Sequence, residues 1–90
     1  MKTIAVVGTS QQFINWQSSI NERIKSNRKM VQTSKMKALL VQRWEDAAGT
    51  SFDSIVLLPG FLAVIGVHQL LNQLHDHLRG SALDPTHTIA

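Results

Sequence analysis

The feature that most constrains the fold is a short apolar run that leads directly into a helix start. Residues 3–7 read Thr-Ile-Ala-Val-Val, and Gly8 follows them. β-branched residues favour extended backbone, and a run without polar alternation is typical of a strand buried on both faces of a parallel sheet. Thr9 can then cap a helix, with Gln12 as the second half of a capping box. We therefore expect a strand, a glycine turn and a helix in immediate succession.

Further apolar runs and helical stripes predict three strands and three helices in alternation. The predicted strands are residues 3–7, 29–33 and 53–58, and the predicted helices are residues 10–26, 35–48 and 61–79. An extended conformation is the alternative for residues 38–42. The helical spacing of apolar residues between Met36 and Ala47 favours a helix there.

Alternating strands and helices indicate the α/β class, because parallel neighbours need a crossover connection. We predict a minimal Rossmann-like βαβαβα fold, in which a three-stranded parallel sheet is flanked by helices. The strand order 2-1-3 puts the most apolar strand in the centre and residues 29–33, which have flanking Lys side chains, at an edge. The order 1-2-3 is the alternative. At 90 residues the chain should form one domain, residues 1–80, with a flexible C-terminal tail over residues 81–90.

Composition bears on the compartment of the protein. The chain has no cysteine, which favours a reducing environment, and its first residues do not have the pattern of a secretory signal. Residues 54–67 carry no charge, but this run is shorter than the roughly 20 residues of a membrane-spanning helix and is interrupted by Pro59 and Gly60. We therefore expect a cytoplasmic protein that does not enter a membrane.

The net charge of +3 hides an asymmetry along the chain. Residues 1–43 hold eight Lys or Arg and one acid, whereas residues 44–90 hold five acids and one Arg, so the two parts carry +7 and −4. The candidate partner-binding residues in the cationic part are Arg23, Lys25, Arg28 and Lys29. We expect them to meet an acidic surface, either of a partner protein or of a second copy through the acidic cluster Glu45, Asp46 and Asp53. Phosphate contacts to DNA or RNA are the alternative, although the cluster lacks aromatic side chains for base stacking.

A second candidate site lies at the turn between the first strand and the first helix. A helix N-terminus offers free backbone amides and the positive end of the helix dipole, which suits a nucleotide or another phosphate-bearing ligand. The candidate ligand-binding residues are Gly8, Thr9, Ser10, Gln11 and Gly60. The turn lacks the further glycines of a dinucleotide fingerprint and the Lys of a P-loop, so a simple helix cap is the competing interpretation.

Two segments carry a resemblance to known proteins. They are Gly-Thr-Ser-Gln-Gln-Phe-Ile-Asn-Trp over residues 8–16 and Phe-Asp-Ser-Ile-Val-Leu-Leu-Pro-Gly over residues 52–60. Together they resemble a group of small phage-encoded proteins of Rossmann-like build. The first segment also resembles, more faintly, the start of the SLOG group of nucleotide-sensing domains. The phage resemblance implies a small accessory protein that acts on host components, and the SLOG resemblance implies nucleotide binding.

No catalytic or metal site follows from the sequence. No serine lies in a nucleophile elbow, and the histidines do not have the spacing of zinc ligands within one element. These histidines are His68, His75, His77 and His87. We expect neither enzymatic activity nor a cofactor nor a bound metal.

The predicted function is that of a small non-enzymatic accessory protein, phage-encoded as the resemblance implies, that binds another protein and so modulates or inhibits a host factor. The alternative is a nucleotide- or phosphate-binding module that uses Gly8, Thr9 and Ser10. The predicted last helix, residues 61–79, is more apolar than one face requires, which favours self-association through it.

Overall fold

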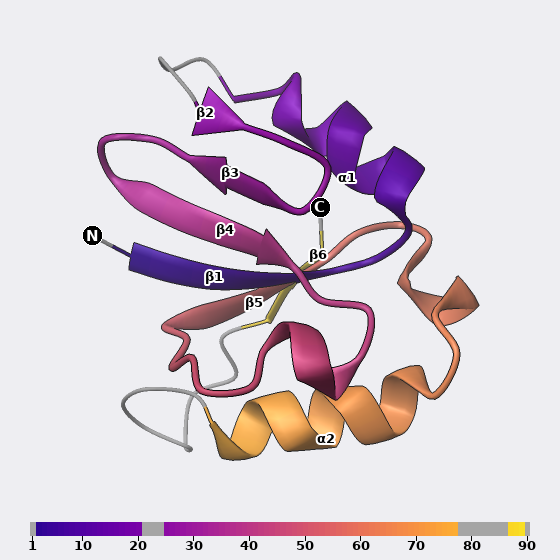
Figure 1. Cartoon of the computed structure of the whole chain (residues 1–90). Coiled ribbons are helices and arrows are strands. Elements are labelled where there is room, and N and C mark those ends of the chain that lie inside the picture. Colours follow the sequence, from indigo (N-terminus) through magenta and orange to yellow (C-terminus); the bar gives the residue numbers. More distant parts are fainter. Residues whose placement is uncertain (1, 21–24, 78–86, 90) are drawn as a thin grey trace.

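The computed structural model describes residues 2–20, 25–77 and 87–89 (Figure 1). Its strands are β1 (Lys2–Val7), β2 (Lys25–Ser26), β3 (Met30–Gln32), β4 (Met36–Leu40), β5 (Ser54–Leu57) and β6 (His87–Ile89). Its α-helices are α1 (Ser10–Gln17) and α2 (Val67–Asp76), and its short 3-10 helices are η1 (Trp44–Asp46) and η2 (Phe61–Ala63). Within this described part of the chain, no helix is long and apolar enough to span a membrane.

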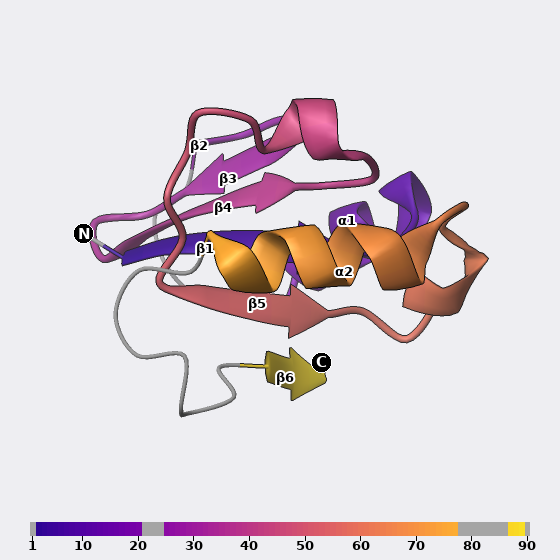
Figure 2. The same ribbon diagram turned by 90° about the horizontal axis from the view of Figure 1, so that it is seen from below.

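The strands form one mixed sheet in the order β2-β3-β4-β1-β5, and β6 adds beyond β5 (Figures 1 and 2). β1 lies between β4 and β5 and is parallel to both, with Val6 opposite Leu40 on one side and opposite Val56 on the other. β2, β3 and β4 form an antiparallel meander, and β6 is parallel to β5. The sheet therefore has a parallel centre and an antiparallel flank.

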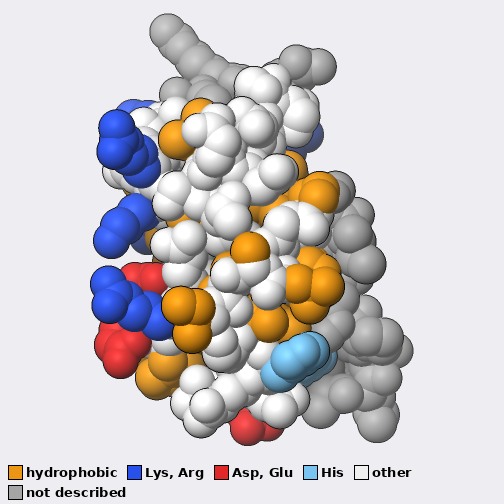
Figure 3. Space-filling view, turned by 90° about the vertical axis from the view of Figure 1, so that its right-hand side faces the viewer, with side chains coloured by type: hydrophobic (Ala, Val, Ile, Leu, Met, Phe, Trp, Pro, Cys, Tyr) orange, Lys and Arg blue, Asp and Glu red, His pale blue; other side chains and the backbone are white. Residues whose placement is uncertain are grey.

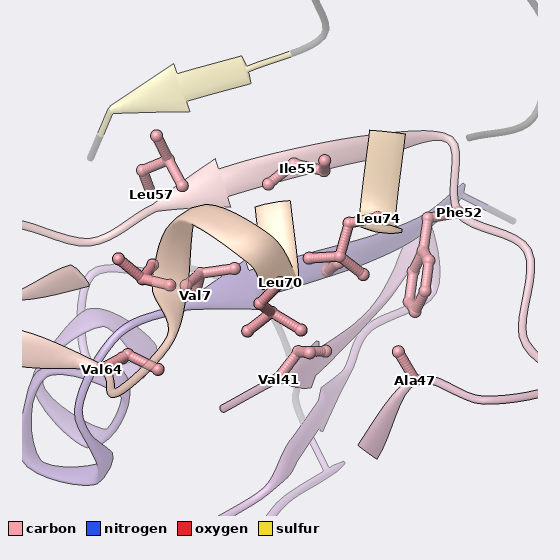
Figure 4. Packing of buried hydrophobic residues seen from close by; sticks show 11 residues of the cluster. Val7, Val41, Ala47, Phe52, Ile55, Leu57, Val64, Leu70 and Leu74 are labelled. Carbon is pink, nitrogen blue, oxygen red and sulfur yellow. The ribbon is translucent and has the colours of Figure 1, made fainter. Parts of the chain in front are cut away.

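The two α-helices cover opposite faces of the sheet, which gives the fold three layers (Figure 2). Successive residues of a strand point to opposite faces. Val7 accordingly belongs to the same buried cluster as Leu70 of α2 (Figure 4), whereas Val6 belongs to the same buried cluster as Phe13 of α1. The expectation that the first strand is buried on both faces is confirmed.

The prediction of a three-stranded parallel, Rossmann-like sheet is wrong. Residues 35–48 do not form a helix but contain β4 and η1. The second predicted strand, residues 29–33, corresponds to β3, which lies between β2 and β4 and is antiparallel to both. The predicted strand order 2-1-3 is wrong as well, because β3 does not pair with β1. The extended alternative for residues 38–42 is correct for residues 38–40.

Two polar side chains explain why this region forms hairpins instead of a crossover helix. Asn27 accepts hydrogen bonds with its Oδ1 atom from the amides of Lys29 at 2.8 Å and Met30 at 2.9 Å. Thr33 does the same in the next turn with its Oγ1 atom, at 3.1 Å. Such Asx and Ser/Thr turns reverse the chain within a few residues. The Asn27 turn joins β2 to β3, and the Thr33 turn joins β3 to β4. Because each turn reverses the chain, the strands that it joins pair in antiparallel orientation.

Both α-helices are shorter than the sequence predicts. α1 ends at Gln17, where the hydroxyls of Ser18 and Ser19 each donate to a carbonyl oxygen three residues earlier at 2.7 Å. Side-chain hydrogen bonds of this kind compete with the helical ladder. α2 begins only at Val67, because Gly66 has a φ of 71°, in the left-handed region that a right-handed helix does not contain.

Some predictions concern residues that lie outside the described part of the chain. The extension of the first predicted helix over residues 21–24 is one of them, and the end of the last predicted helix after residue 77 is another. The flexible tail predicted for residues 81–90 also falls there, except that the backbone of residues 87–89 forms β6.

Candidate functional site at the carboxyl edge of the sheet

The parallel strands β4, β1 and β5 end at the same edge of the sheet, which we call the carboxyl edge. From this edge β1 leads into α1 on one face, whereas β4 leads into η1 and β5 leads through η2 into α2 on the other face. Neighbouring parallel strands whose connections leave on opposite faces open a crevice in which α/β proteins commonly bind ligands. The carboxyl edge is therefore the expected position of a ligand site.

Gly8 and Thr9 form the turn from β1 into α1. Thr9 is the N-cap of α1, because its Oγ1 atom accepts a hydrogen bond from the Gln12 amide at 3.2 Å. Ser10 and Gln11 are exposed and occupy the first turn, where backbone amides have no acceptor within the helix. The predicted cap is confirmed, and the turn presents a helix N-terminus at the carboxyl edge.

Gly60 lies beside this turn although it is far away in the sequence. A Cβ atom at position 60 would be 3.4 Å from Gln12 Cγ and 3.6 Å from Thr9 Cγ2. The cause is the pairing of β1 with β5, which places the two strand ends next to each other. The structure thus brings all the predicted ligand-binding residues, 8–11 and Gly60, to one place.

Gln42 follows β4 and ties its end to the turn after β1. Its Nε2 atom donates to the Gly8 carbonyl oxygen at 3.1 Å, and its backbone amide donates to Asp46 Oδ2 at the same distance. The sequence did not single out this residue as part of a site, because it placed Gln42 in a helix. The signal that could have found it is the end of the apolar run over residues 38–41.

A pocket of about 440 Å³ opens at this point of the edge. It is lined by Thr9, Gln42, Arg43 and residues 63–65. Arg43 is exposed and brings a guanidinium to the rim of the pocket. The sequence analysis did not identify Arg43 as a site residue. The pocket therefore combines an aliphatic wall with a cation, a hydroxyl and an amide.

Of the predicted partner-binding residues, Arg28 and Lys29 lie at the carboxyl edge, whereas Lys25 is in register with Gln32 of β3 and Lys37 of β4, near the amino edge. Lys25 belongs to β2, and Arg28 and Lys29 lie in the turn over residues 27–29, which we call the basic turn; all three side chains are exposed. The Lys29 carbonyl oxygen accepts a hydrogen bond from the Leu40 amide at 2.8 Å, which places the basic turn at the end of β4. Arg23 lies outside the described residues.

The two candidate sites belong to one surface. Leu40 pairs with Val6 of β1, and paired strands are about 4.8 Å apart, so the basic turn lies about 10 Å from the end of β1. Figure 3 shows this side of the molecule, with Lys and Arg side chains along one margin. A partner that contacts one site can therefore contact the other.

Apolar side chains are exposed in the loop between β5 and α2, residues 61–66, which we call the apolar loop. Ile65 is 97% exposed and Leu62 is 65% exposed. In Figure 3, hydrophobic side chains gather on this face beside the basic margin. The stripe of α2 itself is buried against the sheet, for example at Leu70 and Leu74. The apolar surface left for self-association is therefore the apolar loop rather than α2.

The exposure of Ile65 follows from the backbone. Its neighbours Val64 and Val67 are buried, and the Val67 amide donates to the Val64 carbonyl oxygen at 3.2 Å. This hydrogen bond closes a four-residue turn over residues 64–67. Gly66 is the third residue of the turn and takes the left-handed conformation that this position requires. The turn is anchored on both sides, so it holds Ile65 outward.

His77, the C-cap of α2, contacts η1. Across residues 2–20, 25–77 and 87–89, no group of three or more His, Asp or Glu side chains could hold a metal ion. The ring of His77 lies over Trp44, with 4.5 Å between the ring centroids, and its Nδ1 atom is 2.9 Å from the Gln73 carbonyl oxygen. These contacts join the end of α2 to η1.

Comparisons of the chain with protein-family models, curated proteins and solved structures gave no match. The resemblance to small phage-encoded proteins and to SLOG domains therefore stays a prediction from the sequence.

Proposed function

We propose that this protein is a small non-enzymatic accessory protein that binds another protein through the carboxyl edge. The observation that carries the proposal is the exposure of Leu62 and Ile65 on an anchored loop beside Arg43. Single exposed apolar side chains are ordinary, but large ones grouped on one face and rimmed by polar or charged side chains are typical of protein interfaces. The phage resemblance makes a host protein the expected partner, whose activity the contact would modulate or inhibit.

The cations define the charge of the partner surface. Arg28, Lys29 and Arg43 are exposed, and no carboxylate in the described part of the chain forms an ion pair with them. Exposed cations without an ion-pair partner attract an acidic surface and accelerate the encounter. The screening length falls from about 10 Å at 0.1 M salt to about 3 Å at 1 M, so association should slow as salt is added.

Charge reversal at two edges of the sheet tests this proposal. The variant Arg28→Glu/Lys29→Glu inverts the basic turn. The variant Lys2→Glu/Lys37→Glu makes the same change in net charge at the opposite edge, where β1 and β4 begin, and serves as the matched control.

The measurement uses a partner captured from lysate by the full chain and then purified. We expect the basic-turn variant to slow association about tenfold at low salt and the control to leave the rate nearly unchanged. Equal effects of the two variants, or none from the first, would contradict the proposal. Light scattering on the purified chain alone shows whether the partner is a second copy.

A small phosphate-bearing ligand is the second candidate, favoured by the pocket that Thr9, Gln42 and Arg43 line beside the N-terminus of α1. A phosphate there would meet first-turn amides and a guanidinium, both of which bind such anions well. Titration with nucleotides and cyclic nucleotides, followed by the amide signals of residues 8–12, distinguishes the two functions. Saturable shifts support the ligand, whereas unchanged signals together with a captured protein support the partner.

A further inference from the structure

Ile65 stands between two hollows of the carboxyl edge. The first is the pocket described above, about 440 Å³, which Arg43 borders. The second, about 560 Å³, is lined by residues 62–69. Ile65 contributes to the walls of both, so the surface consists of one protruding aliphatic side chain with a recess on each side.

Cations border the first hollow and extend along this edge, and Asp and Glu side chains lie beside the lower part of the same margin (Figure 3). No Asp or Glu lines either hollow. Arg43 lies at the first hollow, and the basic turn with Arg28 and Lys29 lies at the same edge. Arg pairs with carboxylates through two parallel hydrogen bonds, which fixes orientation as well as charge. Carboxylates on a partner are therefore the complement of Arg43 and of the basic turn.

We propose that the apolar loop and Arg43 form a docking site for a short acidic segment of a partner protein. The segment carries two large apolar side chains, one for each hollow beside Ile65, and carboxylates that face Arg43 and the basic turn. This inference rests on the proposed protein-binding function and adds the chemistry of the bound segment. Binding gains free energy because the segment removes Ile65 and Leu62 from water.

Nucleic acid is the less suitable occupant of this surface. Phosphates would satisfy the cations but would leave Ile65 and Leu62 exposed to water. Neither hollow is lined by Phe or Trp, the side chains on which unpaired bases stack well.

The test begins with the immobilised full chain and a display library of random 16-residue peptides. We expect enrichment of acidic peptides that contain two large apolar residues at a constant spacing. The most enriched peptide is then synthesised, and its dissociation constant is measured with the wild-type chain and with variants.

Two pairs of variants make the measurement specific. Ile65→Ser should weaken binding of the synthetic peptide about tenfold or more, since it removes the aliphatic side chain between the hollows. Ile14→Ser is the matched control, because Ile14 is an exposed isoleucine of α1 that lines neither hollow. Arg43→Gln should weaken binding and flatten its salt dependence, whereas Lys37→Gln, at the start of β4, should change neither.

Several outcomes would overturn this inference. They are enrichment of neutral or basic peptides, no enrichment at all, or binding that responds equally to Ile65→Ser and Ile14→Ser. Binding of mixed-sequence duplex DNA that needs the basic turn but not Ile65 would assign the edge to nucleic acid. The protein-binding function itself would survive the first three outcomes if a captured partner still responds to reversal of the basic turn but not to the control reversal.

Discussion

Gly8 packs directly against the side chain of Leu58: a Cβ atom at position 8 would lie 2.7 Å from Leu58 Cβ and 2.8 Å from Leu58 Cδ1. Both residues are buried at the carboxyl edge, and the Leu58 amide donates to the Val7 carbonyl oxygen at 3.0 Å. The glycine that ends β1 is therefore required by packing between β1 and β5. Its presence alone is not evidence for a phosphate-binding loop.

Gly8→Ala should destabilise the protein by about 1–3 kcal/mol, the usual effect of overpacking a filled core. Gly60→Ala is the control, because a Cβ atom there would approach no atom closer than 3.4 Å. Urea unfolding followed by tryptophan fluorescence measures both free energies of unfolding. Equal stability of Gly8→Ala and the wild type would show that Leu58 moves aside without loss.

Thr9→Ala should lower the free energy of unfolding by about 1 kcal/mol, because the Gln12 amide loses its side-chain acceptor at the start of α1. Thr9→Ser keeps the hydroxyl and should retain most of the stability. The same urea titration provides the comparison. An equal loss in both variants would place the contribution of Thr9 in its methyl group instead of in the cap.

Asp53 connects the starts of β1 and β5 at the amino edge of the sheet. Its Oδ2 atom accepts a hydrogen bond from the Thr3 amide at 2.8 Å, and its own amide donates to the Thr3 carbonyl oxygen at 2.8 Å. Asp53→Ala removes the carboxylate and should destabilise the protein by about 1–3 kcal/mol. Asp53→Asn keeps an acceptor and should lose less. If thermal unfolding ranks these two variants in the opposite order, the hydrogen bond to Thr3 is not what Asp53 contributes.

Asn27→Ala should loosen the basic turn without unfolding the core. The amides of Lys29 and Met30 lose the side-chain oxygen that accepts both of them, so their hydrogen exchange should become faster. Asn27→Asp retains that acceptor and serves as the control. Unchanged exchange at both amides in Asn27→Ala would show that Asn27 does not hold the turn.

The sequence identified β1 and β5 because each is a compact apolar run that ends at a glycine or a proline. It failed over residues 35–48, since β4 reads Met-Lys-Ala-Leu-Leu and lacks the polar alternation that distinguishes a strand from a helix. A second error is the predicted helix over residues 10–26, for which Asn27 is the expected end. The same side chain suits the end of a helix and the start of an Asx turn, and only the pairing of β2 with β3 decides between them.

Some residues of the candidate site could be predicted from the sequence, and others could not. The Gly8 and Thr9 turn is local, so its cap could be predicted from adjacent residues. The approach of Gly60 depends on the pairing of β1 with β5, and Arg43 joins the site only because β4 is a strand that ends there. The exposure of Ile65 depends on the turn at Gly66, which interrupts what otherwise resembles a continuous apolar helix.

The most direct test of the carboxyl edge as a protein-binding surface is site-specific photo-cross-linking in lysate. A photoreactive phenylalanine analogue is placed at position 62 of the full chain, and at position 14 in a control chain. We predict discrete cross-linked proteins from position 62 that disappear when excess wild-type chain competes or when the basic turn carries Arg28→Glu/Lys29→Glu, and none of these from position 14. The same products from both positions, or no product from position 62, would contradict the account.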